Sequence, residues 1–388
     1  MSNKTIVILG ASYAGLTVAH KLLKHTYSKA QNFKVVLVSP STHLFWNMAS
    51  PRGIIPGLFA DDQLFQPILQ GFEKYPKESF SFIEGAASAV DVEKTAVVVK
   101  TNAGPLETLH YDILVIATGA SSAEHMPLKQ EGSYKDTLER LHGLQKRVAE
   151  STSIVVGGAG TTGVEVAGEL GFEYYGKGKS ITLITNSEHV LPSLRKDVGA
   201  FAENELRKLD VEIIPNTKVT AASPHSDAQT ELTLSTGKTL LADLYIPTTG
   251  LKPNTSFLPP QLLSPTTHDV FTDAYLRVPS TPRNTVFAVG DCTGIESKQI
   301  KHTEDQAVHL AGNLDALLTG EGGEAAMKEY LPSTTQMILL TVGRSKGTGI
   351  VAGRRVWSWV VWAFKKRMGT EKLGRVAGGT GLVVSGSV

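Results

Sequence analysis

Apolar residues occur along the chain in short runs rich in valine, isoleucine and leucine, and several of these runs end in glycine. The run Thr5–Leu9 leads into Gly10-Ala-Ser-Tyr-Ala-Gly15, and the run Ile154–Val156 leads into Gly157-Gly-Ala-Gly160-Thr-Thr-Gly163. In both places small residues follow, as in the first turns of a packed helix. This pattern is typical of a buried strand that turns directly into a helix. We therefore expect two βαβ units that begin about 150 residues apart.

The first unit continues with a helix to about Leu22 and a strand over Lys34–Val38. Short apolar runs at Phe80–Ile83 and Ala96–Val99 predict a small antiparallel insertion. The run that begins at Tyr111 then predicts a buried strand ending in the turn Ala117-Thr118-Gly119.

The second unit repeats this order. Its second strand is expected over Ile181–Thr185, and the run Ala242–Thr249 ends in Gly250, so a strand is again followed by Thr-Gly. The chain then returns to the first unit, where Thr285–Gly290 predicts another strand and Thr303–Leu318 a helix.

Glycine turns of this kind let the backbone approach a pyrophosphate, which then lies at the positive N-terminus of a helix. Two of them in one chain predict two dinucleotides held face to face, a bound FAD and a diffusing NAD(P)H. From the turns and strand ends we expect FAD near Gly10, Gly15, Ser39, Ala117, Thr118, Gly119 and Asp291. Asp291 is placed to bond ribityl hydroxyls, or is simply a turn-forming residue. We expect NAD(P)H near Gly158, Gly160, Thr162, Gly163, Glu165 and Gly250.

The predicted fold class is therefore α/β, with two Rossmann-like dinucleotide-binding domains, the NAD(P) domain being inserted in the FAD domain. The FAD domain is expected over residues 1–120 and 253–325, and the NAD(P)H domain over 121–252. A smaller C-terminal α+β region is expected over 326–388.

Three positions depart from the usual nucleotide-binding pattern. Ser12 replaces the middle glycine, and Ser39 stands where an acidic residue usually binds the adenosine ribose, so we expect looser adenosine contacts. The second domain has Thr185 at the corresponding strand end. The pattern therefore does not choose between NADH and NADPH, although Arg195 and Lys196 follow nearby, either near a 2′-phosphate or as solvated charges.

The composition excludes several classes of function for this protein. The net charge of +1 gives no electrostatic footprint for nucleic acid, and no spacing of side chains suggests a metal site. Cys292 is the single cysteine, which excludes an intramolecular disulfide, a CxxC redox pair and a cysteine-rich zinc site. Because a Rossmann strand begins at Thr5, we expect a cytoplasmic protein without a signal or transit peptide.

The segment Arg354–Arg367 contains three of the four tryptophans, between basic clusters. It is far shorter than the roughly twenty apolar residues that span a bilayer. One interpretation is a helix at a membrane surface; the other is a helix packed on the protein itself or on a dimer partner. We expect a monomer or a homodimer. We expect the glycine-rich end, Val376–Val388, to be disordered.

With these features in this order, the chain resembles flavoproteins with two dinucleotide-binding domains over nearly its full length. It is most similar to the apoptosis-inducing-factor-like group of the AMID or ferroptosis-suppressor-protein type, with type II NADH dehydrogenases as more distant relatives. The segments that carry the resemblance are Asn47–Arg52, Gly157–Glu165 and Leu340–Gly349. The resemblance implies FAD contacts at Gly10, Ala11, Ser12, Tyr13, Ala14, Arg52, Ala87 and Asp291.

The resemblance also implies a reaction, the reduction of quinones by NAD(P)H, often at a membrane surface. We expect hydride to pass to the flavin and electrons to pass on to a quinone or similar small acceptor, so the flavin carries the chemistry. Glu165 is the side chain expected nearest the nicotinamide, with helix packing as its alternative role. His302 is a candidate proton donor to the reduced quinone, or a solvated loop residue. For Arg52, the alternative to an FAD contact is a salt bridge on the protein surface.

Two other functions remain open from the sequence. One is a tailoring flavoenzyme of a biosynthetic pathway that acts on an aromatic or polyketide-like metabolite. The other is a redox-responsive signalling flavoprotein, in which a stable flavin–nicotinamide complex alters partner binding.

Overall fold

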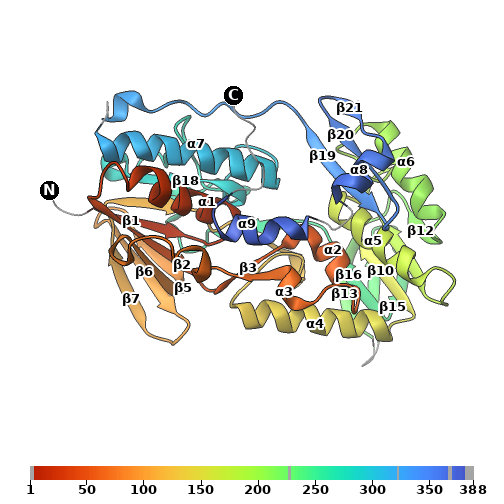
Figure 1. Ribbon diagram of the computed structural model, residues 1–388. Helices are drawn as coiled ribbons and strands as arrows, with labels where there is room; N and C mark the ends of the chain where they lie inside the picture. Colours follow the sequence, from red (N-terminus) through yellow and green to blue (C-terminus); the bar gives the residue numbers. More distant parts are fainter. Residues whose placement is uncertain (1–3, 226–228, 321–322, 366–368, 381–388) are drawn as a thin grey trace.

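Five parallel strands form the centre of the larger domain. The computed structural model describes residues 4–225, 229–320, 323–365 and 369–380. One seven-stranded sheet has the order β18-β8-β1-β2-β5-β6-β7, parallel as far as β5 and antiparallel beyond it (Figure 1). Its strands are β1 (Lys4–Leu9), β2 (Phe33–Ser39), β5 (Phe80–Asp91), β6 (Ala96–Thr101), β7 (Leu106–His110), β8 (Ile113–Ile116) and β18 (Val286–Ala288).

Strand β1 shows why the apolar runs predict this sheet. Ile6 and Ile8 belong to one buried cluster, while Val7 and Leu9 belong to another, so β1 is covered on both faces. Helices α1 (Tyr13–Lys21) and α7 (Ile300–Thr319) pack together over the first of these clusters. A fully buried parallel strand reads as a continuous apolar run, as the sequence does here.

The second domain repeats the design at smaller size. Its parallel sheet has the order β12-β11-β10-β16, and helices α5 and α6 pack against it. A separate antiparallel sheet of β13, β14 and β15 lies in the same part of the chain. The bounds are β10 (Ser153–Gly157), α5 (Thr161–Tyr174), β11 (Ser180–Ile184), α6 (Lys196–Arg207), β12 (Val211–Ile214), β13 (Val219–Pro224), β14 (Thr230–Leu234), β15 (Thr239–Ala242) and β16 (Leu244–Pro247).

Two adjacent strands connect the domains. Strand β9 (Ala120–Ser122) leaves the first domain and pairs antiparallel with β17 (Leu251–Pro253), which returns to it. Asn254 closes this crossing, because its backbone N–H donates to the carbonyl of Gly119 and its side chain donates to that of Thr118. The chain thus leaves and re-enters the first sheet at one place. The sequence prediction of an α/β fold with two Rossmann-like domains is confirmed.

Short elements fill the space between the two sheets. Strands β3 (His43–Phe45) and β4 (Phe65–Pro67) form a two-stranded ribbon, and between them lie the short helices α2 (Ser50–Gly53) and α3 (Asp61–Leu64). The longer helix α4 (Tyr134–Glu150) follows β9 and is capped by Ser133, whose hydroxyl accepts from the N–H of Asp136.

The C-terminal region crosses the molecule twice. After α7 the chain runs to the second domain, where the antiparallel strands β19, β20 and β21 and helix α8 pack near α5 and α6 (Figure 1). It then returns to the first domain, where α9 lies against α1. The bounds are β19 (Met337–Val342), β20 (Lys346–Val351), β21 (Arg354–Arg355), α8 (Ser358–Lys365) and α9 (Leu373–Ala377).

Helix α9 corrects one sequence prediction. Val376 and Ala377, which were expected to begin a disordered end, are buried against the first domain. The apolar side chains of this short helix are buried against the first domain, and this packing orders the segment despite the glycines that follow it. Residues 381–388 lie outside the described part of the chain.

His20 on α1 joins the two ends of the chain. Its Nε2 lies 2.9 Å from the carbonyl of Ala377, its Nδ1 lies 3.0 Å from the hydroxyl of Tyr75, and its ring stacks on Phe72. Burial lowers the pKa of His20 to about 4. The neutral ring is therefore the form that the folded protein holds at neutral pH.

This pKa shift predicts an acid-labile contact. The unfolded chain binds the proton near pH 6.5 and the folded protein only near pH 4, so stability is complete above pH 6.5 and falls as the pH drops through this range. The loss should reach about 3 kcal/mol for a shift of this size. Urea unfolding of wild type and His20→Gln at pH 7 and pH 4.5 measures it. The drop should be smaller in the variant, and equal drops in the two proteins would contradict the assignment.

Candidate functional site

A large cavity runs between the two domains. It has a volume of about 1230 Å³ and lies at the carboxyl ends of the parallel strands, where α/β proteins bind their ligands. This exceeds the roughly 300–1,000 Å³ of ordinary ligand pockets, so it has room for more than one ligand. The predicted site residues that line it are Gly10, Ala11, Ser12, Tyr13, Ala14, Ser39, Ala87, Ala117, Thr118, Gly119, Gly160, Thr162, Glu165, Gly250 and Asp291.

Five predicted site residues do not line the cavity: Gly15, Arg52, Gly158, Gly163 and His302. For Gly15 and Gly163 the reason is the close approach of a helix to the turn before it. A Cβ at Gly15 would lie 1.8 Å from the carbonyl oxygen of Gly10, and a Cβ at Gly163 would lie 1.8 Å from that of Gly158. These glycines let each helix approach its strand and form the back of the turn.

The two turns have the shape and charge that a pyrophosphate requires. Gly10 and Gly158 have backbone φ values of +106° and +105°, which residues other than glycine rarely adopt. Neither α1 nor α5 has an acidic residue in its first turn, and neither has a side-chain cap. The positive ends of both helix dipoles are therefore uncompensated by the protein, as a dinucleotide phosphate would need.

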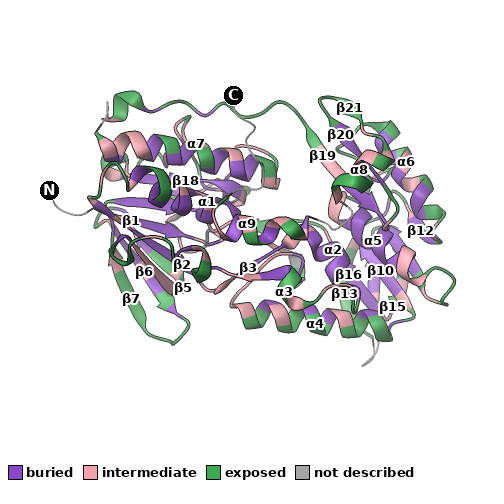
Figure 2. Ribbon diagram, in the orientation of Figure 1, coloured by how far each residue is buried: buried purple, intermediate pink, exposed green. Residues whose placement is uncertain are grey.

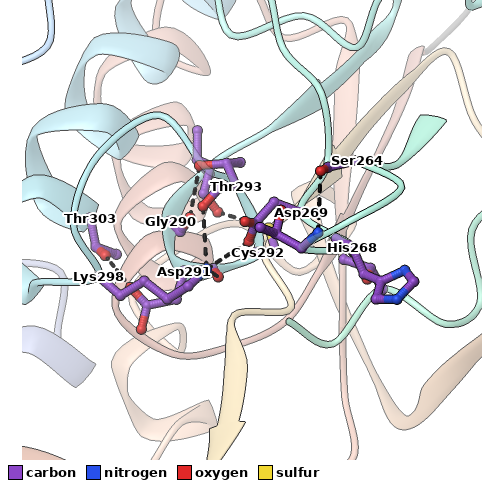
Figure 3. A network of polar contacts seen from close by, with 12 residues as sticks. Ser264, His268, Asp269, Gly290, Asp291, Cys292, Thr293, Lys298 and Thr303 are labelled. Atoms are coloured by element: carbon purple, nitrogen blue, oxygen red, sulfur yellow. Dashed lines mark hydrogen bonds and ion pairs between the residues drawn. The ribbon is translucent and has the colours of Figure 1, made fainter. Parts of the chain in front are cut away.

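Asp291 lies at the end of β18 inside a polar network. Its carboxylate forms an ion pair with Lys129. It also accepts from the hydroxyl of Thr303 at 3.4 Å (Figure 3). Lys298 donates to the backbone carbonyl of Asp291 at 2.6 Å and to the carboxylate of Asp269 at 2.7 Å. The loop that carries Asp291 is thus fixed from several sides. Lys129 lies in a loop without a recognisable pattern, so nothing in the sequence pointed to it.

At the end of the cavity expected to hold adenosine, the hydroxyl of Ser39 is hydrogen-bonded within its own loop. Its hydroxyl donates to the carbonyl of Ser41 at 3.0 Å and accepts from the N–H of the same residue at 3.2 Å. Small residues on β5, among them Gly85 and Ala87, line the adjoining wall. Because the serine hydroxyl already has two partners, it has little capacity left for a ribose.

Glu165 lies on the wall that the second domain contributes. Its Oε1 accepts from Lys365 of α8 at 2.6 Å and from the backbone N–H of Thr341 on β19 at 3.0 Å. The C-terminal region therefore neutralises this carboxylate and forms part of the same wall. The sequence could indicate Glu165 from its helix but not Lys365, which follows it by 200 positions.

His302 does not line the cavity, although Ser297, which it contacts, does. It is 7% exposed, and its Nδ1 lies 3.0 Å from the carbonyl of Ser297, the geometry of a donated N–H. Its neighbour Lys301 lines the cavity and pairs with Asp305. The interpretation of His302 as a solvated loop residue is wrong, because it is buried at the start of α7. Its proposed proton transfer would require a path through the cavity wall.

Arg52 is also away from the cavity surface. Its Nε donates to Oε1 of Glu169 on α5 at 2.8 Å, and its side chain is 8% exposed while that of Glu169 is 0%. The alternative interpretation as a surface salt bridge is thus wrong in one respect, since the ion pair is buried. Its partner belongs to the other nucleotide domain.

Cys292, the single cysteine, is fully buried behind the site. Its thiol donates weakly to the carbonyls of Val289 at 3.3 Å and Ile116 at 3.5 Å. Burial raises the pKa of this thiol to about 11. A thiol with these properties neither attacks a substrate nor joins a disulfide cycle.

A cavity shared by two glycine turns of this kind defines an oxidoreductase that binds two nucleotides. Residues 4–309 match the family described as pyridine nucleotide-disulphide oxidoreductase, and the chain belongs to this family. FAD and NAD(P)H are its cofactors, as the sequence predicted. The lone buried cysteine shows that this member does not act through a dithiol of its own.

Individual relatives agree with the predicted resemblance. Oxidoreductase ptaL of Pestalotiopsis fici is 39% identical over 97% of this chain and 99% of its own. Ferroptosis suppressor protein 1 of Taeniopygia guttata is 27% identical over 93% of this chain and 92% of its own. The fold is similar to that of NDH2 from Plasmodium falciparum in complex with NADH, with a TM-score of 0.78, 14% identity, and coverage of 97% of this chain and 96% of that one.

The burial of Cys292 predicts an oxidoreductase that is insensitive to thiol reagents. Iodoacetamide at pH 8 should leave the native protein unlabelled and its NAD(P)H oxidation intact, because the thiol is protonated and out of contact with water. After unfolding in urea the same reagent should label one site, which mass spectrometry counts. Rapid labelling of the native protein with loss of activity would contradict this account.

Proposed function

We propose that the protein passes two electrons from NAD(P)H, by way of FAD, to a quinone or a similar small planar acceptor. The observation that carries the proposal is an apolar wall on the cavity that both nucleotide turns share. Strand β19 and helix α8 supply it through Met337, Ile338, Leu339 and Phe364. An apolar wall beside a flavin site suits a flat aromatic acceptor.

Each part of the cavity has a defined task in this reaction. The turn at Gly10 and the N-terminus of α1 hold the pyrophosphate of FAD, and the turn at Gly158 with the N-terminus of α5 holds that of NAD(P)H. When bound, FAD takes hydride from the nicotinamide and passes the electrons to the acceptor. Lys365 neutralises the carboxylate of Glu165, which the second wall presents to the cavity.

Phe364 is the residue that tests the acceptor wall, because its ring is available to stack on a planar ligand. Phe364→Ala should raise the KM for a short-chain quinone about ten-fold, the effect of one lost aromatic contact of about 1–1.5 kcal/mol. Steady-state kinetics with varied quinone measure this, and anaerobic reduction of the flavin by NADH should change less. Phe271→Ala, at an exposed position away from the cavity, is the control.

The outcome also separates the other candidate functions. Reduction of the flavin by NAD(P)H without turnover of any simple quinone would contradict the proposal and favour a tailoring enzyme with a dedicated substrate. The higher identity to oxidoreductase ptaL than to ferroptosis suppressor protein 1 is the observation that favours this alternative. Very slow turnover with persistent long-wavelength absorbance would instead favour a signalling flavoprotein.

We further propose that helix α8 meets a membrane surface. Trp357 and Trp359 are 72% and 70% exposed, while Val361, on the other side of α8 from Trp359, is buried and packs on Gly347. Arg354 and Arg355, which form β21 just before them in the chain, are exposed, and exposed residues make up much of α8 (Figure 2). Within the described residues, no helix is both long and apolar enough to cross a bilayer. Aromatic rings next to basic residues are typical of surfaces that lie at the headgroup level.

Changing Trp357, Trp359 and Trp362 together to Ser should remove most binding to lipid vesicles and slow turnover of long-tailed quinones. Co-sedimentation with phosphatidylcholine vesicles, with and without phosphatidylserine, measures the first effect. High salt should remove only the basic contribution, about 1 kcal/mol for each Arg or Lys near the surface. Leu106→Ser with Leu241→Ser, two exposed positions elsewhere, is the control. Absence of vesicle binding by the wild type at low salt would contradict the proposal.

A further inference from the structure

Helix α5 carries three carboxylates at a spacing of four residues, Glu165, Glu169 and Glu173. This spacing places them along one side of the helix. Each pairs with a cation from outside the second nucleotide domain. Glu165 pairs with Lys365 of α8, Glu169 with Arg52 of α2, and Glu173 with Arg344 of the turn between β19 and β20. Helix α5 is therefore the element on which three parts of the fold meet.

The central pair, Arg52 with Glu169, is the most deeply buried of the three. Nε and Nη2 of Arg52 lie 2.8 and 2.7 Å from the same oxygen, Oε1, of Glu169. Oε2 of Glu169 lies 3.5 Å from Nε of Arg344, whose guanidinium also lies over the ring of Phe172. A fully buried carboxylate cannot exchange these partners for water without a large penalty, so its cations hold their places.

The pair lies behind the cavity and connects its two walls. On α2, the residues just before Arg52, Ser50 and Pro51, line the cavity, while Arg52 does not. On α5, Glu165 lines it one turn before Glu169, which does not. Helices α2 and α5 lie side by side in the fold (Figure 1). A displacement of Arg52 relative to Glu169 would thus move one nucleotide wall relative to the other.

Other contacts also connect the two walls, and they are either neutral or more exposed than the Arg52–Glu169 ion pair. Strands β9 and β17 form a thin crossing of two strands. Gln145 of α4 donates to the carbonyl of Gly53 at 2.7 Å, and the Ser50 hydroxyl donates to that of Leu128 at 3.0 Å. These two are neutral hydrogen bonds, and the ion pair of Lys129 with Asp291 is more exposed, with side chains 18% and 15% accessible. The Arg52–Glu169 contact joins two more deeply buried charges, and a charge-assisted contact is roughly twice as strong as a neutral hydrogen bond.

We infer that Arg52 is a positioning residue that, through Glu169, sets the separation between the FAD and NAD(P)H walls and with it the rate of hydride transfer. Hydride transfer requires the reacting atoms within about 3–3.5 Å, and a displacement of about 1 Å can slow a reaction about 100-fold. The inference rests on the two-nucleotide assignment alone. It is independent of the acceptor, since flavin reduction is measured without one.

The decisive variant removes both charges together. Arg52→Met with Glu169→Met places an apolar side chain at both positions and removes both charges of the pair, and Arg344 keeps Glu173. The matched control is Arg207→Met with Glu203→Met, an ion pair of 2.8 Å on the surface of α6. In the first variant we expect FAD content and midpoint unfolding temperature near those of the wild type. The anaerobic rate of flavin reduction at saturating NADH should fall at least about ten-fold.

A second measurement reports the separation without any catalysis. Leu106→Cys on β7 and Leu241→Cys on β15 are exposed positions in the two domains, and Cys292 is buried and leaves spin labels to these two sites. Pulsed electron–electron double resonance should give a narrow distribution of distances between the two spin labels in the otherwise wild-type protein. The distribution should broaden or shift in the Arg52→Met/Glu169→Met protein and stay narrow in the control pair.

The outcomes decide between positioning and simple support. An unchanged distance distribution and an unchanged reduction rate, whether or not the unfolding temperature falls, would overturn the inference. If the double variant fails to fold, Arg52→Lys serves instead, because it retains the charge but shortens the reach to Glu169. Its reduction rate should lie between wild type and a ten-fold loss, with the KM for NADH changed less than the rate. A rate equal to wild type together with an unchanged distance distribution would likewise overturn the inference.

Discussion

The structure depends on a close approach between backbone segments at two turns. At Gly15 and Gly163 a helix lies so near the preceding glycine that any side chain would overlap a carbonyl oxygen. This approach points the N-terminus of each helix toward the cavity and keeps the turn residues small enough to receive a phosphate. The position of both sheets, and of the cavity between them, follows from these two contacts. Substitutions elsewhere on the cavity wall would alter what the cavity binds. Substitutions at these glycines would remove the two turns that receive the phosphates.

Much of the fold could be predicted because its signals are local. A strand buried on both faces reads as an unbroken apolar run, and a glycine turn after it marks the start of a helix, so β1, β8, β10 and β16 were all visible in the sequence. The repeated order of strand and Thr-Gly turn predicted that one domain is inserted in the other. The predicted positions at strand ends line the cavity because the carboxyl ends of parallel strands meet at one edge.

The contacts that prediction missed join residues far apart in the chain. Lys129 reaches Asp291 across 162 positions, and Arg52 reaches Glu169 across 117. Nothing in either local sequence indicates the partner, since a lysine in a loop and an arginine after a proline have many ordinary roles. His302 illustrates the opposite error, because its type suggested chemistry, while at the start of α7 its ring is buried against the carbonyl of Ser297. Side-chain direction, unlike strand position, has no periodic signature here.

The contact between His20 and Ala377 joins residues 357 positions apart, the first on the first helix of the chain and the second on the last. The chain must therefore be synthesised as far as Ala377 before the core beside α1 can close. Until then the groove that α9 fills, with Phe72 and Tyr75 at its edge, exposes apolar surface to water. The first domain to be made is thus among the last to be completed, and a chain that stops short of α9 would expose this surface permanently.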